Sequence, residues 1–192
     1  MDSLVLSEQL TESAQKFLQS PGLQVHARPE WGSHNPAHRD LIRAEIQKLL
    51  PENWHSSTSH TEGVGVIVLS PHPIGVDVEV TERVSDKTVA RVSSPEELAA
   101  APSAAALWCA KEACFKALRS YDQPSVISKI SIGSWENIDS QTETFRLSNY
   151  ETFNSSSENR GVVKKISTWS LAFLFFPLNF GLVLPKSLLT KR

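Results

Sequence analysis

Three things are scarce in this sequence: cysteine, an excess of charge of one sign, and uninterrupted hydrophobic runs. The 192 residues include only two cysteines, Cys109 and Cys114, and the formal net charge is −2. Five positions apart on one predicted helix, these thiols point in different directions and do not form a disulfide. They also do not form a Cys-x-x-Cys metal motif. We therefore expect reduced thiols in a cytoplasmic protein.

The charge and hydropathy patterns exclude further classes. The chain contains no basic block of five or more residues, which disfavours nucleic-acid binding, because that binding depends on Lys and Arg neutralising phosphates. The most apolar stretch, 171–184, is interrupted by Pro177, Asn179 and Gly181 and is too short to cross a membrane, so we expect two strands joined by a turn near 177–179. The acidic N-terminus, which lacks an apolar run, does not resemble a secretion signal.

Two common catalytic motifs are also missing from the sequence. No Gly-x-x-x-x-Gly-Lys loop is present, which disfavours a nucleoside triphosphatase of that class. No Gly-x-Ser-x-Gly elbow is present either, which disfavours acyl transfer through a serine nucleophile.

The hydrophobic patterns that are present predict an α+β chain. At 192 residues it is long enough for one substantial core or two small lobes. The turn at 70–73 predicts that the strands on either side of it pair as a hairpin or cross closely. Helices are expected over 3–19, 36–50, 85–92 and 107–118, strands over 23–27, 64–69, 74–80, 126–135, 142–147 and 162–176, and polar connections over 52–63 and 81–106.

The strand predicted over 74–80 carries two carboxylates on one face. β-Branched residues alternate along it, so Asp77 and Glu79 share the opposite face with Gly75. Residues two apart on a strand are separated by about 6.6 Å along it. Both carboxylates are therefore near enough to reach one cation.

The last predicted helix carries Glu112 and Lys116 four positions apart, and so on one face. Lys111 lies about 100° round the helix from Glu112. If this helix meets the 74–80 strand, Asp77, Glu79 and Glu112 form an oxygen-only site for a hard cation. Lys111 and Lys116 then lie nearby to hold phosphate.

Taken separately, each pattern has an ordinary explanation. An alternating strand is usually half-buried with a solvated face, and a Lys-Glu-x-x-x-Lys helix is usually an exposed face with an i,i+4 pair. Together and in this order, they resemble the signature of the 4'-phosphopantetheinyl transferases, an Ile/Val-Gly-Ile/Val-Asp-x-Glu strand followed by Trp/Phe-x-x-Lys-Glu-x-x-x-Lys. The matching segments are Ile74-Gly75-Val76-Asp77-Val78-Glu79, Trp108-Cys109-Ala110-Lys111-Glu112-Ala113-Cys114-Phe115-Lys116, the Ser-His motif in Thr58-Ser59-His60 and the N-lobe helix in Ala37-His38-Arg39.

The resemblance covers residues 36–135 with motifs and is closest to the two-lobed, surfactin-synthetase-activating branch. It implies two similar α+β lobes, a pseudo-dimer, over residues 1–72 and 73–192. Each lobe would be a small, mostly antiparallel sheet packed on a helix, with the active site at the lobe interface. Chains of this branch can work as monomers.

The implied reaction moves the phosphopantetheine arm of coenzyme A to a serine of an acyl or peptidyl carrier protein and releases adenosine 3',5'-bisphosphate. The resemblance implies that Asp77, Glu79 and Glu112 hold Mg²⁺, which prefers hard oxygen ligands. Glu112 is also the candidate base for the serine proton, and Lys116 balances charge on the pyrophosphate. Asp77, Glu112 and Lys116 are thus the expected catalytic set. Whether the carrier serves fatty acid, polyketide, nonribosomal peptide or lysine biosynthesis stays open.

Coenzyme binding is expected to involve Arg39 and His60 at the 3'-phosphate, with Ser59 in support, and Lys111 and Lys116 at the pyrophosphate. The sequence departs from the family pattern in three places. The gap from Asp77 to the catalytic-helix glutamate is only 35 residues, and the Gly-Lys-Pro element and the basic N-terminal stretch are missing. An alternative is therefore a weak or inactive relative that binds coenzyme A or a carrier protein.

Overall fold

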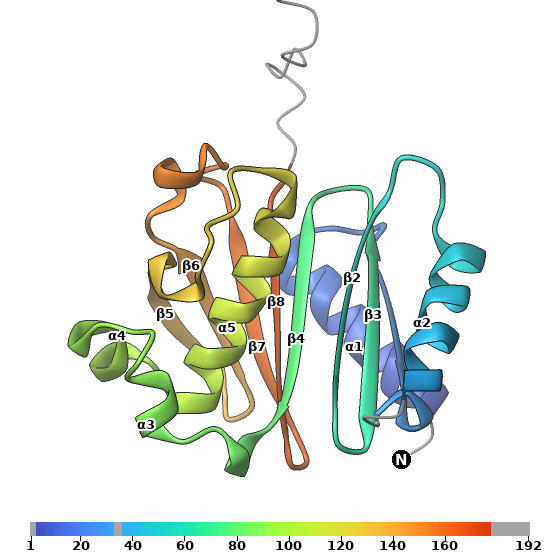
Figure 1. Ribbon diagram of the computed structural model, residues 1–192, viewed down its shortest axis with the longest axis horizontal. Helices are drawn as coiled ribbons and strands as arrows, with labels where there is room; N and C mark the ends of the chain where they lie inside the picture. Colours follow the sequence, from blue (N-terminus) through green and yellow to red (C-terminus); the bar gives the residue numbers. More distant parts are fainter. Residues whose placement is uncertain (1–2, 33–35, 178–192) are drawn as a thin grey trace, which may run out of the picture.

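Two antiparallel sheets form the framework of the chain, with the edge of one beside the edge of the other (Figure 1). The structure is a computed structural model that describes residues 3–32 and 36–177, and of residues 36–39 it describes the backbone alone. The smaller sheet has three strands in the order β1-β3-β2, and the larger has five in the order β4-β8-β7-β6-β5. The strands are β1 Gln24–Arg28, β2 His55–Thr61, β3 Val64–Ser70, β4 Ile74–Val80, β5 Ile132–Asp139, β6 Thr142–Leu147, β7 Arg160–Ile166 and β8 Trp169–Phe175.

Helices cover the sheets on both sides. In Figure 1, α5 lies over one face of the larger sheet, α2 lies over the smaller sheet, and α1 lies behind both sheets. The α-helices are α1 Ser3–Leu18, α2 Pro36–Leu49, α3 Asp86–Val89, α4 Pro95–Ala100 and α5 Ala104–Ala117. Short 3₁₀ turns are η1 Pro29–Trp31, η2 Thr81–Arg83, η3 Leu118–Ser120, η4 Ile127–Lys129 and η5 Tyr150–Phe153. The α+β class is as expected, and no helix among the described residues is both long and apolar enough to span a membrane.

One hydrophobic cluster joins the two sheets. It packs Leu6 and Leu10 of α1 against Val66 of β3, Val76 of β4 and Phe173 of β8. Because these side chains come from both sheets, burial of their apolar surface holds the sheets together. Two further clusters fill the space between α5 and the larger sheet and between α2 and the smaller sheet.

A polar stripe on α1 closes the outer edge of the smaller sheet. Ser7, Thr11 and Gln15 follow one another at intervals of four and share one helix face. The Ser7 and Thr11 hydroxyls accept from the backbone N–H groups of Ala27 and Val25 at 2.9 and 3.0 Å. The Gln15 amide donates to the carbonyls of residues 21 and 23. The edge of β1 is therefore satisfied by side chains.

The structure corrects several of the predicted elements. The polar segment 52–63, expected as a connection, contains β2, whose hydroxyls find partners in the fold. Of the two arrangements expected for the strands on either side of the 70–73 turn, the hairpin is wrong, because β3 and β4 belong to different sheets, although the two strands do contact each other. The expected strand over 162–176 is two strands with a turn after Ile166, where Ser167 adopts φ 54°. The expected strand over 126–135 begins as the turn η4.

Other expectations about the layout stay predictions. The second strand expected after Pro177 lies outside the described residues. The two sheets differ in size, so the similarity of two lobes divided at 72/73 is not established by the strand count. What the smaller and larger units share is an antiparallel sheet with one helix packed on its face.

Gly75 allows β4 to lie directly against α5. A Cβ placed on Gly75 would lie 2.7 Å from the Ala117 nitrogen and closer still to the Ala113 carbonyl oxygen. These are backbone atoms, which a rotamer change cannot move away. The glycine of the 74–79 motif is therefore a packing requirement that sets the distance between the strand and the helix.

We expect Gly75→Ala to lower the free energy of unfolding by about 3 kcal/mol, because the added methyl group forces β4 and α5 apart. Urea denaturation followed by circular dichroism measures the change. Gly22→Ala is the matched control, since its Cβ would meet nothing nearer than 3.7 Å, and it should be close to neutral. Equal midpoints for the two variants would contradict the packing argument.

Candidate active site

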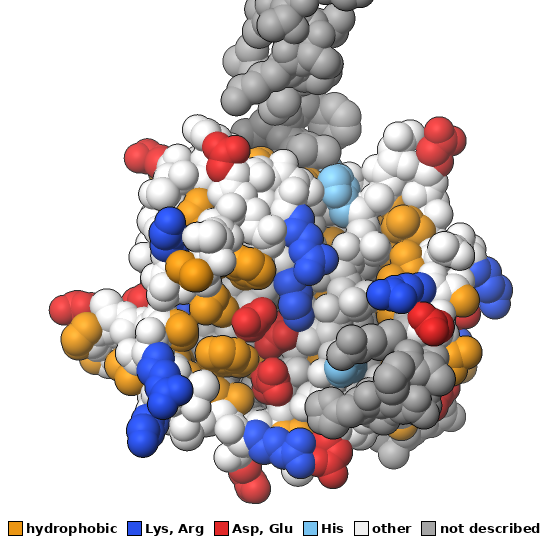
Figure 2. Space-filling model, viewed as in Figure 1, with side chains coloured by type: hydrophobic (Ala, Val, Ile, Leu, Met, Phe, Trp, Pro, Cys, Tyr) orange, Lys and Arg blue, Asp and Glu red, His pale blue; other side chains and the backbone are white. Residues whose placement is uncertain are grey.

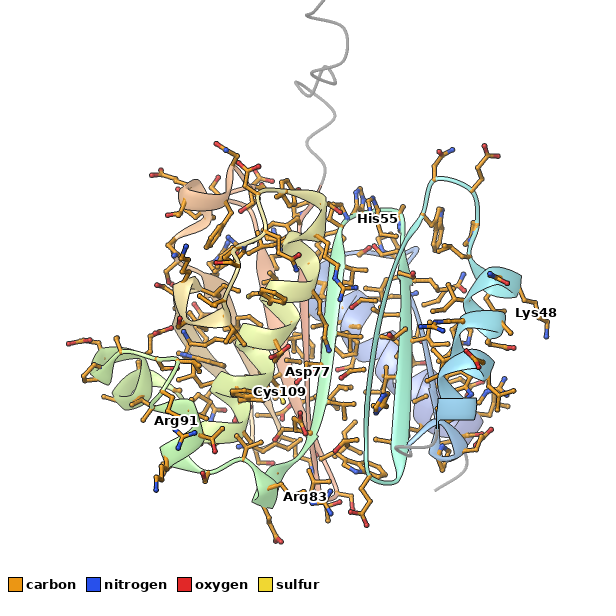
Figure 3. All side chains as sticks on the ribbon, viewed as in Figure 1. Lys48, His55, Asp77, Arg83, Arg91 and Cys109 are labelled. Atoms are coloured by element: carbon orange, nitrogen blue, oxygen red, sulfur yellow. The ribbon has the colours of Figure 1, made fainter. Side chains whose placement is uncertain are left out.

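Asp77 and Lys116 form the centre of a charged cluster between β4 and α5. The Lys116 ammonium donates to Asp77 Oδ1 at 2.8 Å and to the Val76 carbonyl oxygen at 2.9 Å. Asp77 is only 3% exposed, and Figure 3 shows it between the strand and the helix. The predicted meeting of the 74–80 strand with the Lys-Glu helix is thus observed.

Glu79 and Glu112 complete the acidic part of the cluster, and both are partly buried. Burial, followed by the negative charge of Asp77, raises the pKa of each carboxyl group. Lys116 acts in the opposite direction on both. Figure 2 shows acidic and basic side chains next to each other at the surface over α5 and β4. The cluster thus contains more negative than positive charge.

The three carboxylates do not form a ready-made ligand set. Within residues 3–32 and 36–177, no group of three or more His, Cys, Asp or Glu side chains is arranged to hold a metal ion. Lys116 instead takes the position beside Asp77 where a cation would neutralise it. The ammonium reduces the repulsion among the carboxylates. The expected convergence of Asp77, Glu79 and Glu112 on one ion therefore stays a prediction.

The thiol of Cys109 lies beneath the cluster and does not act as a nucleophile there. It is fully buried and donates to the Ser170 carbonyl oxygen at 3.4 Å. Burial, then the charges of Asp77 and Glu79, raises its pKa well above the ordinary value. A thiol that stays protonated is a poor nucleophile.

The residues expected at the coenzyme's 3'-phosphate are not all placed together. The hydroxyl of Ser59 donates to Asp77 Oδ1 at 2.8 Å, so it belongs to the acidic cluster. His60 is the next residue of β2 and leaves from the opposite face of the strand. Thr58 lies on the same face of β2 as His60 and pairs with Ile67 of β3, which packs under α2. The His60 side chain therefore leaves the sheet on the side that α2 covers. Arg39 lies in the first turns of α2, where the structure describes the backbone alone.

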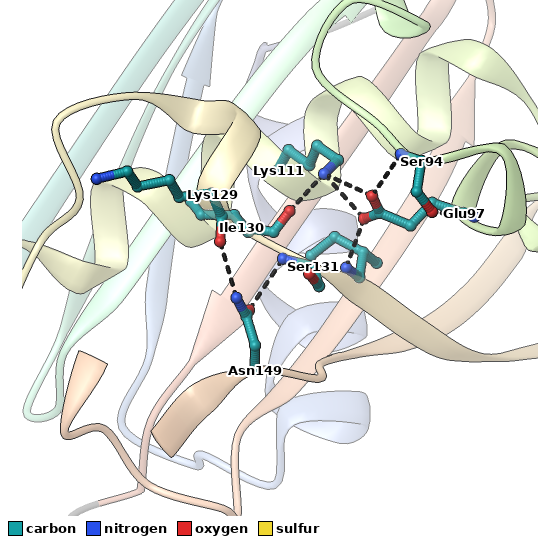
Figure 4. A network of polar contacts seen from close by, with 8 residues as sticks. Ser94, Glu97, Lys111, Lys129, Ile130, Ser131 and Asn149 are labelled. Carbon is teal, nitrogen blue, oxygen red and sulfur yellow. Dashed lines mark hydrogen bonds and ion pairs between the residues drawn. The ribbon is translucent and has the colours of Figure 1, made fainter. Parts of the chain in front are cut away.

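Lys111 is a correction to the predicted site. Its side chain is fully buried on the far side of α5, paired with Glu97 of α4 at 2.8 Å, and it also donates to the Ile130 carbonyl oxygen (Figure 4). Side chains three or four positions apart on an α-helix share a face. Lys111 and Lys116 are five positions apart, so their side chains point in different directions. The structure does not bring Lys111 to the charged cluster of Asp77 and Lys116.

Glu97 is a residue that the sequence reasoning missed. Its carboxylate accepts from Lys111, from the Ser94 backbone N–H that begins α4, and from the Ile132 N–H that begins β5. The signal was present, because Ser94-x-x-Glu97 is a capping box. Its tertiary partners were not visible, since 14 and 35 residues separate Glu97 from Lys111 and Ile132.

Ser57 and Thr61 of β2 were also missed, although they alternate with Ser59 along one strand face. Ser57 Oγ accepts from the Val76 N–H at 3.1 Å, and Thr61 Oγ1 donates to Glu79 Oε2 at 3.5 Å. The sequence offered no signal for them, because residues 55–61 are polar at every position and show no alternation.

A pairing of an acidic strand with a Lys-Glu helix on an α+β framework defines a protein suited to phosphate chemistry. Residues 73–174, more than half of the chain, match the family model of the 4'-phosphopantetheinyl transferase superfamily. The chain belongs to this superfamily, whose members act on coenzyme A and carrier proteins. A comparison with curated protein sequences finds no significant match.

We expect Glu97→Ala to lower the free energy of unfolding by about 3–5 kcal/mol, because it leaves the Lys111 ammonium buried without a counter-charge. Asp40→Ala removes an ion pair with Arg43 in which both side chains are more than 70% exposed, and should change stability by less than about 1 kcal/mol. Urea unfolding of both variants tests this. Similar losses of unfolding free energy in the two variants would show that the ion pair with Glu97 does not stabilise the buried Lys111 as described.

We expect Glu79→Gln to raise the melting temperature at pH 7, by no more than a few degrees because solvent screens part of the repulsion from Asp77. The folded protein binds the Glu79 proton more tightly than the unfolded chain, so ionising it lowers stability as pH rises above the ordinary pKa of 4.5. Calorimetry should show that the difference in melting temperature between the variant and the wild type disappears below that pH. A difference independent of pH would contradict the electrostatic cause.

Proposed function

We propose that the protein transfers the 4'-phosphopantetheine arm of coenzyme A to a serine hydroxyl of an apo acyl or peptidyl carrier protein and releases adenosine 3',5'-bisphosphate. The observation that carries the proposal is the contact of Lys116 with Asp77 at 2.8 Å. It joins the two motifs of the family across 39 residues, with Glu79 and Glu112 beside it.

We propose Asp77 and Glu79 as the ligands of a Mg²⁺ ion, with Glu112 at its margin. The residues fit this role because Asp77 Oδ2 is buried without a hydrogen-bond partner among the described residues and Glu79 is repelled by Asp77. Mg²⁺ is usually held by one or two carboxylates, several waters and substrate phosphate oxygens, so two protein ligands suffice. When bound, the ion supplies positive charge to the pyrophosphate of coenzyme A.

The remaining chemistry belongs to α5. Glu112 accepts the proton of the attacking serine, directly or through a water, and its raised pKa makes it a better proton acceptor than an ordinary glutamate. Lys116 lies beside it, four positions on, and turns from Asp77 to the pyrophosphate as negative charge develops on the leaving group. No covalent intermediate with the protein is required.

Coenzyme and carrier contacts extend this proposal. We assign the 3'-phosphate to Arg39 and His60. The assignment is supported by the fold, because α2 and the face of β2 that carries His60 lie on the same side of the smaller sheet.

For the carrier protein, we propose a binding surface along the 81–103 segment, because the family resemblance implies that this segment helps to form the carrier surface. A cavity of about 670 Å³ opens there between α3, α4 and the start of α5, lined by Leu98, Ala101 and Leu107 among others.

The two-lobed type, action as a monomer and a cytoplasmic location are parts of the same proposal. The two-lobed type is supported by a helix packed on an antiparallel sheet in each half of the chain. The location is supported by the free thiols of Cys109 and Cys114.

We expect Asp77→Asn to abolish transfer while the fold is kept. The purified variant, coenzyme A, Mg²⁺ and a panel of apo carriers are combined, and intact mass spectrometry of the carrier measures the added arm. Asp139→Asn, at the exposed end of β5, is the matched control and should leave transfer unchanged. Normal turnover by Asp77→Asn would remove Asp77 from the site.

The alternative is a relative that binds coenzyme A or a carrier without transfer. The absence of a ready-made three-ligand group among the described residues favours it, as does the missing Gly-Lys-Pro element. Calorimetry with coenzyme A, with and without Mg²⁺, separates the two. Binding that ignores the metal and yields no modified carrier would establish the alternative and overturn the transferase.

A further inference from the structure

Side-chain hydroxyls bridge the boundary between the two sheets. Strands β2 and β4 lie side by side at this boundary in Figure 1, yet they belong to different sheets and, over their described lengths, share no backbone ladder. Three alternate residues of β2 reach across instead. We call Ser57, Ser59 and Thr61 the hydroxyl seam, and their partners on β4 are the Val76 N–H, the Asp77 carboxylate and the Glu79 carboxylate.

The seam leaves Asp77 with two unlike oxygens. Oδ1 accepts from Ser59 and from Lys116, each at 2.8 Å. Oδ2 is buried and has no hydrogen-bond partner among the described residues. The nearby Cys109 thiol, a weak donor with one hydrogen, is shared between the Ser170 carbonyl oxygen and the Asp77 carboxyl group. A carboxylate anchored through one oxygen and left without a strong donor at the other is oriented to bind a cation.

Glu79 is held in a similar but looser way. The Thr61 hydroxyl lies 3.5 Å from Oε2, and a hydrogen bond from the Trp108 side chain acts on the same carboxyl group. Both donors are neutral. A cation that arrives beside Asp77 and Glu79 repels Lys116, whereas it does not repel a hydroxyl. The hydroxyl seam can therefore keep its hydrogen bonds when a cation takes the place of the Lys116 ammonium.

We propose that Ser59 and Thr61 are positioning residues, which act from the smaller sheet to orient Asp77 and Glu79 toward a divalent cation. Ser57 has a different role, because its partner is a backbone N–H and its contribution is to hold the sheets together. The inference rests on the proposed function, since it assumes that Asp77 and Glu79 are the ligands. It makes cation affinity depend on residues that need not touch the ion.

The test measures Mn²⁺ binding to the full chain with coenzyme A and without a carrier, from the electron paramagnetic resonance signal of free Mn²⁺. We expect Ser59→Ala to weaken binding about 10-fold, the scale typical for partners of metal ligands. Thr61→Val should weaken it less, because its contact is longer. Ser59→Thr and Thr61→Ser keep the hydroxyl and should bind close to the wild-type level.

Ser57→Ala is the matched control from the same strand face. We expect it to lower the melting temperature but to leave Mn²⁺ affinity unchanged. If Ser59→Ala and Thr61→Val bind Mn²⁺ as the wild type does, the positioning role is overturned and the proposed function stands. If the wild-type protein binds no Mn²⁺, the ligand assignment of Asp77 and Glu79 fails, and this inference fails with it.

Discussion

The backbone contact between β4 and α5 at Gly75 is the constraint on which the site depends. Because no side chain stands between them there, the strand approaches the helix closely enough for Lys116 to reach both Asp77 and the Val76 carbonyl. A wider spacing would separate the ammonium from the carboxylate. The glycine therefore contributes to the chemistry through distance, although it carries no functional group.

The two lysines of α5 illustrate two uses of a buried charge. Lys111 is fully buried and matched by Glu97, which in turn fixes the beginnings of α4 and β5. This pair is satisfied and holds elements in place. Lys116 faces more carboxylates than it can neutralise, and the pKa values of Glu79 and Glu112 rise as a result of burial and of Asp77. Perturbed carboxyl pKa values and an excess of negative charge of this kind are typical of functional sites.

The boundary between the sheets gives the site a second source of order. A shared hydrophobic cluster with α1 joins the sheets on one side, and the hydroxyl seam joins β2 to β4 at their edges. Hydroxyls of the smaller sheet thereby donate to the acidic residues of the larger one. The acidic cluster in this way depends on both sheets for its hydrogen bonds, although its charged groups all belong to β4 and α5.

The sequence by itself determined the α+β class and most element positions, because these follow from local periodicity. The resemblance to a family signature also predicted that the strand carrying Asp77 meets the helix carrying Lys116, as observed. The catalytic roles of Asp77, Glu112 and Lys116 stay predictions. The sequence could not place Lys111 correctly, since the partner Glu97 lies on another helix and an i,i+1 neighbour of Glu112 points elsewhere. It also could not show that β2 is a strand or that β3 and β4 belong to different sheets. Polar side chains reveal a strand only through partners distant in the chain, and those partners are fixed by tertiary packing alone.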